Sequence, residues 1–316
     1  MKKWKILFIG VGSIAKRHIR NVNTFIKSIK NECQIDVFRT RVGCDLDEEI
    51  CKLVTSVYFE VKLVPADYDI IFITNPTQLH FETLLKFMDH GKNFFIEKPF
   101  CTVQQIPQIA MNLKKDSVYY VASPLRYHPV IQYIRKNIDL NSVFSVQCIS
   151  SSYLPDWRPG TDYTKTYSAH KDLGGGVSID LIHEWDYITY LFGMPKGVKS
   201  FICHKSDLKI DSDDLAIYIA EYEKMTVEIH VDYIGREPLR KLSLIMKEDT
   251  VICDLLQGTI CYLKENKTIK LKCDRDTYQV AELEHFWGLI RDEKYGAENM
   301  MHAINVLKIA GGIWRE

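Results

Sequence analysis

The sequence predicts an α/β protein in two parts, an N-terminal doubly wound parallel sheet and a C-terminal part built on a mainly antiparallel sheet. The first 120 residues alternate short, continuous apolar runs with amphipathic stretches, which is typical of β-α-β units whose sheet is buried on both faces. From about residue 140, short β-rich runs follow one another through tight connections, as antiparallel hairpins do. The 316 residues are also enough for about two domains.

The elements follow from these patterns in order. We expect N-terminal strands at 5–9, 34–38, 69–73 and 93–97, and helices at 13–28, 78–90 and 102–115. The start of the chain superficially resembles a signal peptide, but we interpret it as a buried strand that runs into a glycine turn. The later β-rich runs are 143–151, 198–203, 215–222, 225–233, 241–246, 251–255 and 259–263, with helices at 178–192, 280–292 and 296–310. We place the domain boundary so that 1–121 is a dinucleotide-binding domain and 122–316 a domain for substrate binding and oligomerisation.

Composition excludes several classes of function. The 41 basic and 41 acidic residues give a formal net charge of zero, so a bulk electrostatic footprint for nucleic acid or an anionic membrane is absent. The nine cysteines cannot all pair within one chain, and none form a C-x-x-C motif. We therefore predict a cytoplasmic protein with free thiols and no metal site. No apolar run reaches the 18 or so residues of a membrane span.

A glycine motif, Gly10-x-Gly12-x-x-Ala15, stands directly after the first predicted strand and opens the first helix. The first glycine permits a tight turn, and the second lets the backbone approach a pyrophosphate at the helix N-terminus. The motif predicts a dinucleotide site with Gly10, Gly12, Ser13 and Ile14 at the phosphates. The alternative is an ordinary glycine turn.

The end of the second strand bears on the choice of cofactor. NAD-binding folds place an acidic residue there, whereas this chain has Arg39-Thr40-Arg41. A guanidinium group can bind a 2′-phosphate through charge-assisted hydrogen bonds, so we predict NADP in preference to NAD. Alternatively, one or both arginines face solvent.

Two further segments follow predicted strands at the same edge of the sheet, where ligands bind in doubly wound folds. Thr74-Asn75-Pro76 precedes a helix that includes His80, and Glu97-Lys98-Pro99 closes the strand 93–97. A lysine in this place can hydrogen-bond a substrate hydroxyl, although a surface Lys-Pro turn is the alternative. The predicted cofactor-binding residues are Gly10, Gly12, Ser13, Ile14, Arg39, Thr40, Arg41, Thr74, Asn75, Pro76, His80, Glu97 and Lys98.

Three glycines, 174–176, precede a segment with Asp180, His183 and Asp186. Residues three apart share a helix face, and a carboxylate that orients a histidine makes a useful proton-transfer group. His183-Glu184 is not a zinc-binding H-E-x-x-H motif, because Tyr187 occupies its last position. A histidine that only packs the helix is the alternative.

Together these motifs resemble the glucose–fructose oxidoreductase/inositol dehydrogenase (Gfo/Idh/MocA) family over nearly the whole chain. The matches are Gly10-x-Gly12 with His18, Asn75-Pro76 with His80, Glu97-Lys98-Pro99, Arg126-Tyr127-His128-Pro129, and the three glycines followed by Asp180 and His183. The resemblance implies a Rossmann domain joined to a domain with a large open, mainly antiparallel sheet. It also implies a nicotinamide-dependent dehydrogenase or reductase of sugars, sugar nucleotides or related polyols, in carbohydrate biosynthesis.

By motif match, Lys98, Asp180 and His183 are the catalytic set. His183 would take the hydroxyl proton, Lys98 would polarise that oxygen, and Asp180 would orient the site. Many members space the Asp and His four residues apart rather than three, which leaves open whether Asp180 or Asp186 supports His183.

The aromatic and ionic loop 154–167 has the composition of a sugar-binding lid, or is an ordinary polar loop; its Arg158 suggests an anionic substrate. The predicted substrate-binding residues are Lys98, Tyr127, Arg158, Tyr163, Asp180 and His183. A homodimer or homotetramer through the C-terminal sheet is expected. The alternative functions are a glycosidase that uses tightly held NAD and a non-catalytic dinucleotide-binding sensor.

Overall fold

The computed structural model describes residues 2–40, 46–109 and 112–314. They form two compact units: residues 1–122 with 279–304, and residues 123–278 with 305–316. The first division lies one residue from the predicted boundary, but 279–304 lie with the first unit, whereas the sequence-based division placed them in the second domain. The assignment of residues 1–121 and 122–316 to two domains with separate roles stays a prediction.

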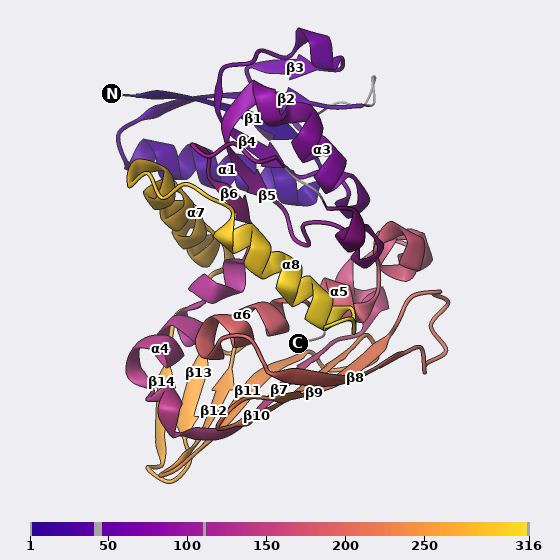
Figure 1. The fold of residues 1–316 in the computed structure, drawn as a ribbon, viewed down its shortest axis with the longest axis vertical. Helices are drawn as coiled ribbons and strands as arrows, with labels where there is room; N and C mark the ends of the chain where they lie inside the picture. Colours follow the sequence, from indigo (N-terminus) through magenta and orange to yellow (C-terminus); the bar gives the residue numbers. More distant parts are fainter. Residues whose placement is uncertain (1, 41–45, 110–111, 315–316) are drawn as a thin grey trace. The chain divides into compact units, whose positions relative to one another are not determined.

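A six-stranded parallel sheet with the order β3-β2-β1-β4-β5-β6 forms the centre of the first unit (Figure 1). Its strands are β1 (Lys3–Ile9), β2 (Glu32–Phe38), β3 (Ser56–Tyr58), β4 (Tyr68–Ile73), β5 (Gly91–Ile96) and β6 (Tyr119–Val121). Ile9 of β1 pairs with Phe38 of β2 and with Ile73 of β4, and Ile73 pairs with Ile96 of β5. The residues that follow these four strands therefore share one edge of the sheet.

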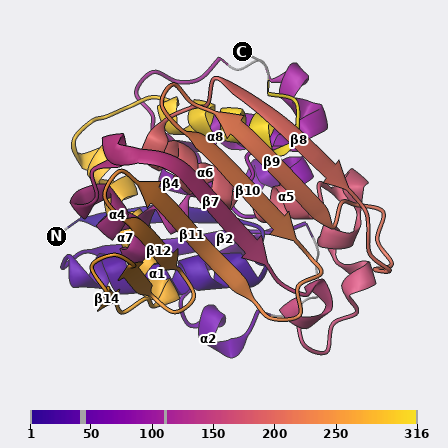
Figure 2. The same ribbon diagram turned by 90° about the horizontal axis from the view of Figure 1, so that it is seen from below.

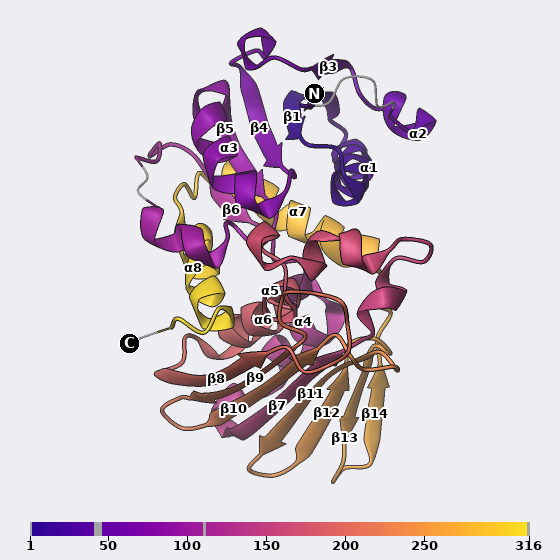
Figure 3. The same ribbon diagram turned by 90° about the vertical axis from the view of Figure 1, so that its right-hand side faces the viewer.

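Helices α1 (Ser13–Ser28) and α3 (His80–Phe87) lie on opposite faces of this sheet (Figures 1 and 3), and α2 (Glu48–Cys51) is short. The unit also contains α7 (Arg275–Arg291) from Gln279 onward and α8 (Glu298–Ala310) as far as Ile304. Aromatic rings fill the core: Phe72 stacks on Phe8 at 4.5 Å and on Phe95 at 4.9 Å between ring centroids. Burial on both faces explains why the strands read as continuous apolar runs.

An eight-stranded sheet with the order β14-β13-β12-β11-β7-β10-β9-β8 forms the second unit (Figure 2). Its strands are β7 (Val143–Ser151), β8 (Gly197–Cys203), β9 (Leu215–Glu221), β10 (Thr226–Asp232), β11 (Leu239–Met246), β12 (Thr250–Asp254), β13 (Thr259–Tyr262) and β14 (Lys267–Lys270). Only β7 and β10 pair in parallel; every other neighbouring pair in this sheet, all of it described, is antiparallel. The predicted fold class, a parallel Rossmann sheet followed by a large mainly antiparallel sheet, is confirmed.

Helices α4 (Pro129–Asn137), α5 (Val177–Asp180) and α6 (His183–Phe192) cover one face of the second sheet (Figure 3). Strand β9 alternates accordingly, with Tyr218 buried and Ile219 56% exposed on the other face. Short 3₁₀ helices fill the connections: Val61–Leu63, Thr77–Leu79, Met88–His90, Val103–Gln108, Pro124–Tyr127, Leu140–Ser142, Leu154–Trp157, Tyr163–Lys165, Tyr167–Ala169 and Lys171–Leu173.

Three predicted helices differ from the structure. The helix predicted at 102–115 is wrong: residues 103–108 form a 3₁₀ helix that contains Pro107, which has no N–H for an α-helical bond. The helix predicted at 178–192 is two helices, because Leu181 and Ile182 form a turn between α5 and α6. The helix predicted at 78–90 is α-helical only over 80–87, between two 3₁₀ turns.

Within the described residues, none of the helices has both the length and the hydropathy that a membrane span needs. None of the eight cysteines that the structure describes is in a disulfide.

Candidate active site

The glycine turn after β1 is shaped by the segment that follows β4. Gly10 has φ +87°, and a Cβ atom there would lie 2.9 Å from the backbone N and Cα atoms of Asn75. Only glycine tolerates both the positive φ and the close approach. Gly12 is exposed, and a Cβ atom there would meet nothing within 4 Å. The turn is thus tight on its inner side and open on its outer side.

Helix α1 begins immediately after this turn, with Gly12 as its N-cap. The first intrahelical bond in this helix runs from the N–H of Lys16 to the carbonyl of Gly12 (3.1 Å). The N–H groups of Ser13, Ile14 and Ala15 precede that bond and have no acceptor within the helix, as at any helix start. An open glycine turn against unsatisfied N–H groups fits the pyrophosphate of a dinucleotide.

The segments at this edge of the sheet are connected to one another by hydrogen bonds of Thr74, Asn75 and His80. The Thr74 hydroxyl donates to the carbonyls of Ile9 (3.0 Å) and Gly10 (3.1 Å). His80 lies with one ring nitrogen 2.8 Å from the Asn75 carbonyl and the other 2.8 Å from the Pro99 carbonyl. Burial lowers the pKa of His80 despite these two carbonyls, which favours the neutral ring.

Asn75 and Pro76 reach the rim of this edge. The Asn75 side-chain nitrogen donates to the Thr83 hydroxyl (2.8 Å), whereas its Oδ1 is buried and has no hydrogen-bond partner. Pro76 is exposed. A buried acceptor that is unpaired beside the glycine turn is where a donor from a ligand is expected.

Glu97 follows β5 and pairs with a histidine of α1. Its Oε1 lies 2.5 Å from His18 Nε2, and its Oε2 accepts the backbone N–H of Lys98 (3.2 Å). Burial by itself raises the pKa of Glu97, but the hydrogen bond and charge of His18, then the charge of Lys98, outweigh burial and lower it. A negative charge therefore stands beside Lys98, which is half-buried.

The predicted 2′-phosphate site lies at the end of β2. The backbone N–H of Arg39 donates to the Tyr58 carbonyl (2.9 Å), which extends the β2–β3 pairing by one residue. Arg39 is half-buried, and Thr40 is exposed. Arg41 lies outside the described residues.

In the second unit, the three glycines let the chain pass close to neighbouring backbone. A Cβ atom at Gly175 would lie 2.0 Å from the Tyr167 carbonyl oxygen, and one at Gly176, where φ is +124°, would lie 2.3 Å from Asp213 Oδ1. Asp213 then accepts the backbone N–H of Ser178 through Oδ2 (2.8 Å), at the start of α5. The glycines and Asp213 together place Asp180 at the end of this helix.

Asp180 is buried and is held by a tyrosine far away in the sequence. The Tyr233 hydroxyl donates to Asp180 Oδ2 at 2.6 Å, and the Tyr167 hydroxyl also bonds to Asp180. Burial, followed by the charge of Asp180, raises the pKa of Tyr233 well above its usual value. Tyr233 therefore stays a neutral donor that orients the carboxylate.

Helix α6 starts at His183 and is tied to its surroundings by two ion pairs. Arg126 binds Asp186 through two nitrogens, at 2.6 and 2.9 Å. Arg240 Nε lies 2.8 Å from Oε1 of the fully buried Glu184. Both carboxylate oxygens of Asp186 thus have Arg126 as their partner.

Asp180 lies in a separate helix from His183. The expectation that Asp180 and His183 share one helix face is wrong, because Leu181 and Ile182 form a turn between them.

The remaining predicted substrate residues lie in short 3₁₀ segments of the second unit or beside them. Tyr127 ends the segment Pro124–Tyr127 and is half-buried. Arg158 is exposed, with its guanidinium 5.6 Å from the Tyr167 ring centroid. Of the three predicted catalytic residues, Lys98 belongs to the first unit, and Asp180 and His183 belong to the second.

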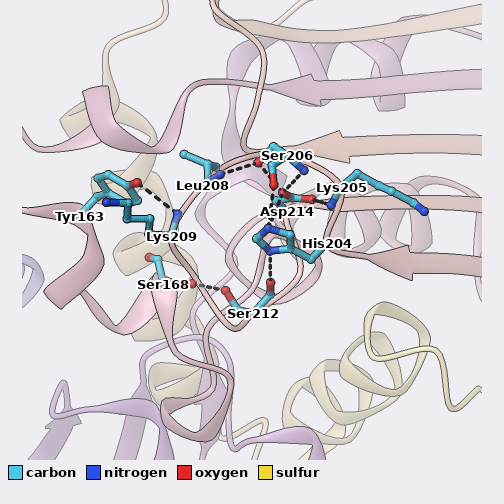
Figure 4. A network of polar contacts seen from close by, with 9 residues as sticks. All are labelled: Tyr163, Ser168, His204, Lys205, Ser206, Leu208, Lys209, Ser212 and Asp214. Atoms are coloured by element: carbon cyan, nitrogen blue, oxygen red, sulfur yellow. Dashed lines mark hydrogen bonds and ion pairs between the residues drawn. The ribbon is translucent and has the colours of Figure 1, made fainter.

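Tyr163 is held by the loop 204–214 (Figure 4). Its hydroxyl accepts the backbone N–H of Lys209 at 3.2 Å. The loop itself closes around the fully buried Asp214, which accepts the N–H groups of Lys205 (2.8 Å) and Ser206 (2.9 Å). The hydroxyl of Tyr163 therefore has a structural partner already.

Among the described residues, His170, Asp172 and Asp211 bring possible metal ligands within 4.8 Å of one another. The Asp211 carboxylate accepts the N–H of Lys171 (2.7 Å) and lies 3.6 Å from His170 Nδ1. Both carboxylate residues are exposed. We assign no metal to them.

Sequence patterns gave no indication of Tyr233 or Arg240. Each acts through a contact between residues more than 50 positions apart, such as the 53 that separate Tyr233 from Asp180. Glu184 carried one available signal, since a charged residue inside an apolar helix needs a buried partner.

Known proteins are similar to this chain in sequence and in fold. A family model described as "Oxidoreductase family, NAD-binding Rossmann fold" (GFO_IDH_MocA) matches residues 4–123. Two curated proteins of Bacillus subtilis (strain 168) each match over 188 residues, or 58% of this chain. The uncharacterized oxidoreductase YrbE is 26% identical, and the match covers 52% of it. The scyllo-inositol 2-dehydrogenase (NAD(+)) is 23% identical, and the match covers 53% of it. The chain thus spans about half the length of these relatives.

Among solved structures, a levoglucosan dehydrogenase in complex with NADH superimposes with a TM-score of 0.82. The superposition covers 99% of this chain and 96% of that one, at 14% sequence identity. At this identity the likeness shows the fold.

Proposed function

We propose that this chain, whose residues 4–123 match the Gfo/Idh/MocA family of oxidoreductases, is an NAD(P)-dependent dehydrogenase or reductase. It transfers a hydride between the nicotinamide and a hydroxyl or ketone of a sugar, a sugar nucleotide or a related polyol, in carbohydrate biosynthesis. The observation that carries the proposal is the open glycine turn at the start of α1, where the chain's own backbone requires Gly10 and leaves Gly12 uncovered.

The first unit would hold the cofactor. The N–H groups at the start of α1, with Ser13 and Ile14, would bind the pyrophosphate, since a helix N-terminus favours an anion. Thr74 and His80 would keep the edge in shape, Asn75 and Pro76 would line it, and Glu97 would orient the strand end that carries Lys98. When bound, a nicotinamide cofactor supplies the hydride donor or acceptor.

The catalytic set would be Lys98, Asp180 and His183. A ring nitrogen of His183 takes the proton of the substrate hydroxyl, and the Lys98 ammonium group binds and polarises the same oxygen. Asp180, whose carboxylate is held by the Tyr233 hydroxyl, orients the site. Tyr127, Arg158 and Tyr163 are the proposed substrate contacts.

A substrate panel tests this function. The full chain is incubated with NAD⁺ or NADP⁺ and neutral or anionic sugars, inositols and sugar nucleotides, and cofactor absorbance is followed. We expect stoichiometric cofactor reduction with at least one member. Binding of a cofactor without net reduction across the panel would contradict an oxidoreductase.

We further propose NADP in preference to NAD, on the strength of Arg39, Thr40 and Arg41. Charge-assisted hydrogen bonds of a guanidinium to the 2′-phosphate are worth about 1.5–3 kcal/mol each. Arg39→Ala should therefore weaken NADPH binding by about tenfold to a hundredfold and leave NADH binding nearly unchanged. The dissociation constants of both cofactors for both proteins provide the measurement.

Arg291→Ala is the matched control, because Arg291 is exposed and lies at the end of α7 in the same unit. It should change neither constant. Tighter binding of NADH than of NADPH by the unmodified protein would overturn the preference.

The helix-free face of the eight-stranded sheet is the proposed oligomer interface. It exposes large apolar side chains, among them Phe144 (56% exposed), Phe201 (54%) and Ile219 (56%). Apolar surface of this kind is costly in water and favours association into a dimer or tetramer. Light scattering at micromolar concentration measures the mass, and a monomer would contradict the proposal.

A further inference from the structure

Two exposed arginines of the second unit lie over tyrosine rings. The Arg236 guanidinium is 3.7 Å from the Tyr153 ring centroid, and that of Arg158 is 5.6 Å from the Tyr167 centroid. Within the described ranges neither guanidinium is in an ion pair. Arg126 and Arg240, by contrast, are both paired with buried carboxylates.

The segments that carry these arginines pack against each other. They follow β7 and β10, which pair in parallel up to Ser151 and Asp232. Beyond the strands, the N–H of Leu154 donates to the Tyr233 carbonyl (3.0 Å), and the Trp157 ring meets the Tyr233 ring edge-on at 5.1 Å. Both arginines therefore belong to one cluster at the carboxyl ends of these two strands.

The same cluster contains the partners of Asp180. Tyr167, which lies beside Arg158, bonds to Asp180 through its hydroxyl, as does Tyr233, three residues before Arg236. Tyr167 is also 40% exposed. Arg158 thus lies over a tyrosine that contacts a carboxylate of the proposed catalytic set, and Arg236 follows the second such tyrosine by three residues.

A guanidinium stacked on a ring keeps its plane fixed and its N–H edge available for two parallel bonds to a carboxylate or phosphate. We infer that Arg158 and Arg236 form a subsite for an oxyanion on the substrate, which is a sugar bearing a phosphate, a nucleotide diphosphate or a carboxylate. The inference rests on the proposed function, because it takes the surroundings of Asp180 as the place where the sugar binds.

Binding of matched probes to the full chain, measured calorimetrically, tests the subsite. D-Glucose is the neutral probe, and D-glucose 6-phosphate, D-glucuronate and UDP-N-acetylglucosamine are the anionic probes. At least one anionic probe should bind about tenfold or more tightly than glucose. The order among the three identifies phosphate, carboxylate or diphosphate as the preferred oxyanion.

The double substitution Arg158→Gln/Arg236→Gln should abolish this preference, so that no anionic probe binds more tightly than glucose. Arg135→Gln is the matched control, since Arg135 also lies over a tyrosine (4.1 Å from the Tyr190 centroid) but on α4. Equal binding of all four probes, no binding of any, or a preference that survives the double substitution would overturn the subsite. Anionic binding without net cofactor reduction in the substrate panel would instead overturn the oxidoreductase and leave the subsite standing.

Discussion

We expect His183→Ala to lower turnover by about 10²–10⁴-fold, the usual contribution of a positioned acid or base. His183 is the first residue of α6 and is half-buried, so its ring is held by a helix that two ion pairs anchor. The residues proposed for the cofactor belong to the other unit. The loss should therefore appear in kcat for the panel substrate, with the dissociation constant of the cofactor unchanged.

His90→Ala is the matched control for this prediction. His90 is likewise half-buried, but its Nδ1 lies 3.1 Å from the Pro65 carbonyl in a surface turn of the first unit. Turnover should stay within a factor of two or so of the unmodified protein. If His183→Ala retained full turnover, the assignment of His183 as the proton acceptor would be wrong. A fall in cofactor affinity of similar size would point to a structural effect instead.

Tyr233→Phe separates orientation from proton transfer. The substitution removes the hydroxyl that donates to Asp180 Oδ2 at 2.6 Å, so its effect on turnover reports the orientation of Asp180.

Most of the first sheet could be predicted from local pattern alone. Four of its strands are continuous apolar runs, and the glycine motif marks the start of α1 at Ser13. The strands Ser56–Tyr58 and Tyr119–Val121 were missed because three residues carry too little periodicity to distinguish a strand from a loop. At 102–115, helical spacing of apolar residues was outweighed by Pro107.

The sequence predicted the residue types of the candidate site more fully than the arrangement of those residues in space. Glycine motifs and charged strand ends are short-range signals, and each has a structural basis here. The helical spacing of Asp180 and His183 is also a short-range signal, but it is wrong, because a turn separates the two residues. No local signal in the sequence predicts the turn at Leu181 and Ile182, because both are apolar residues that fit a helix. Tyr233, the partner of Asp180, directly follows β10, and Arg240, the partner of Glu184, lies in β11; long-range pairs of this kind leave no mark on local spacing.

Removal of the Arg240 side chain should loosen α6 by about 3–5 kcal/mol, the usual cost of leaving one charge of a buried pair alone. Glu184 has no exposed surface. Burial lowers the pKa of Arg240 by more than any single neighbour raises it, but the charge of Glu184 together with Tyr187, Tyr278 and Cys148 raises that pKa overall, so Arg240 is charged in the pair. In Arg240→Met the Glu184 carboxylate stays buried without its cation. Hydrogen exchange of peptides from α6 should speed up by about a hundredfold to a few thousandfold.

Two further variants separate the ion pair from a general effect of losing an arginine. Arg20→Met breaks the exposed pair with Glu49, where both side chains are over 40% accessible, and should cost less than about 1 kcal/mol. Glu184→Met/Arg240→Met removes both charges and should restore most of the protection that Arg240→Met loses. If the double variant exchanged as fast as the single one, packing of the Arg240 stem rather than the charge of Glu184 would hold the helix. Because α6 begins at His183, the same loosening should lower turnover in Arg240→Met and recover with it in the double variant.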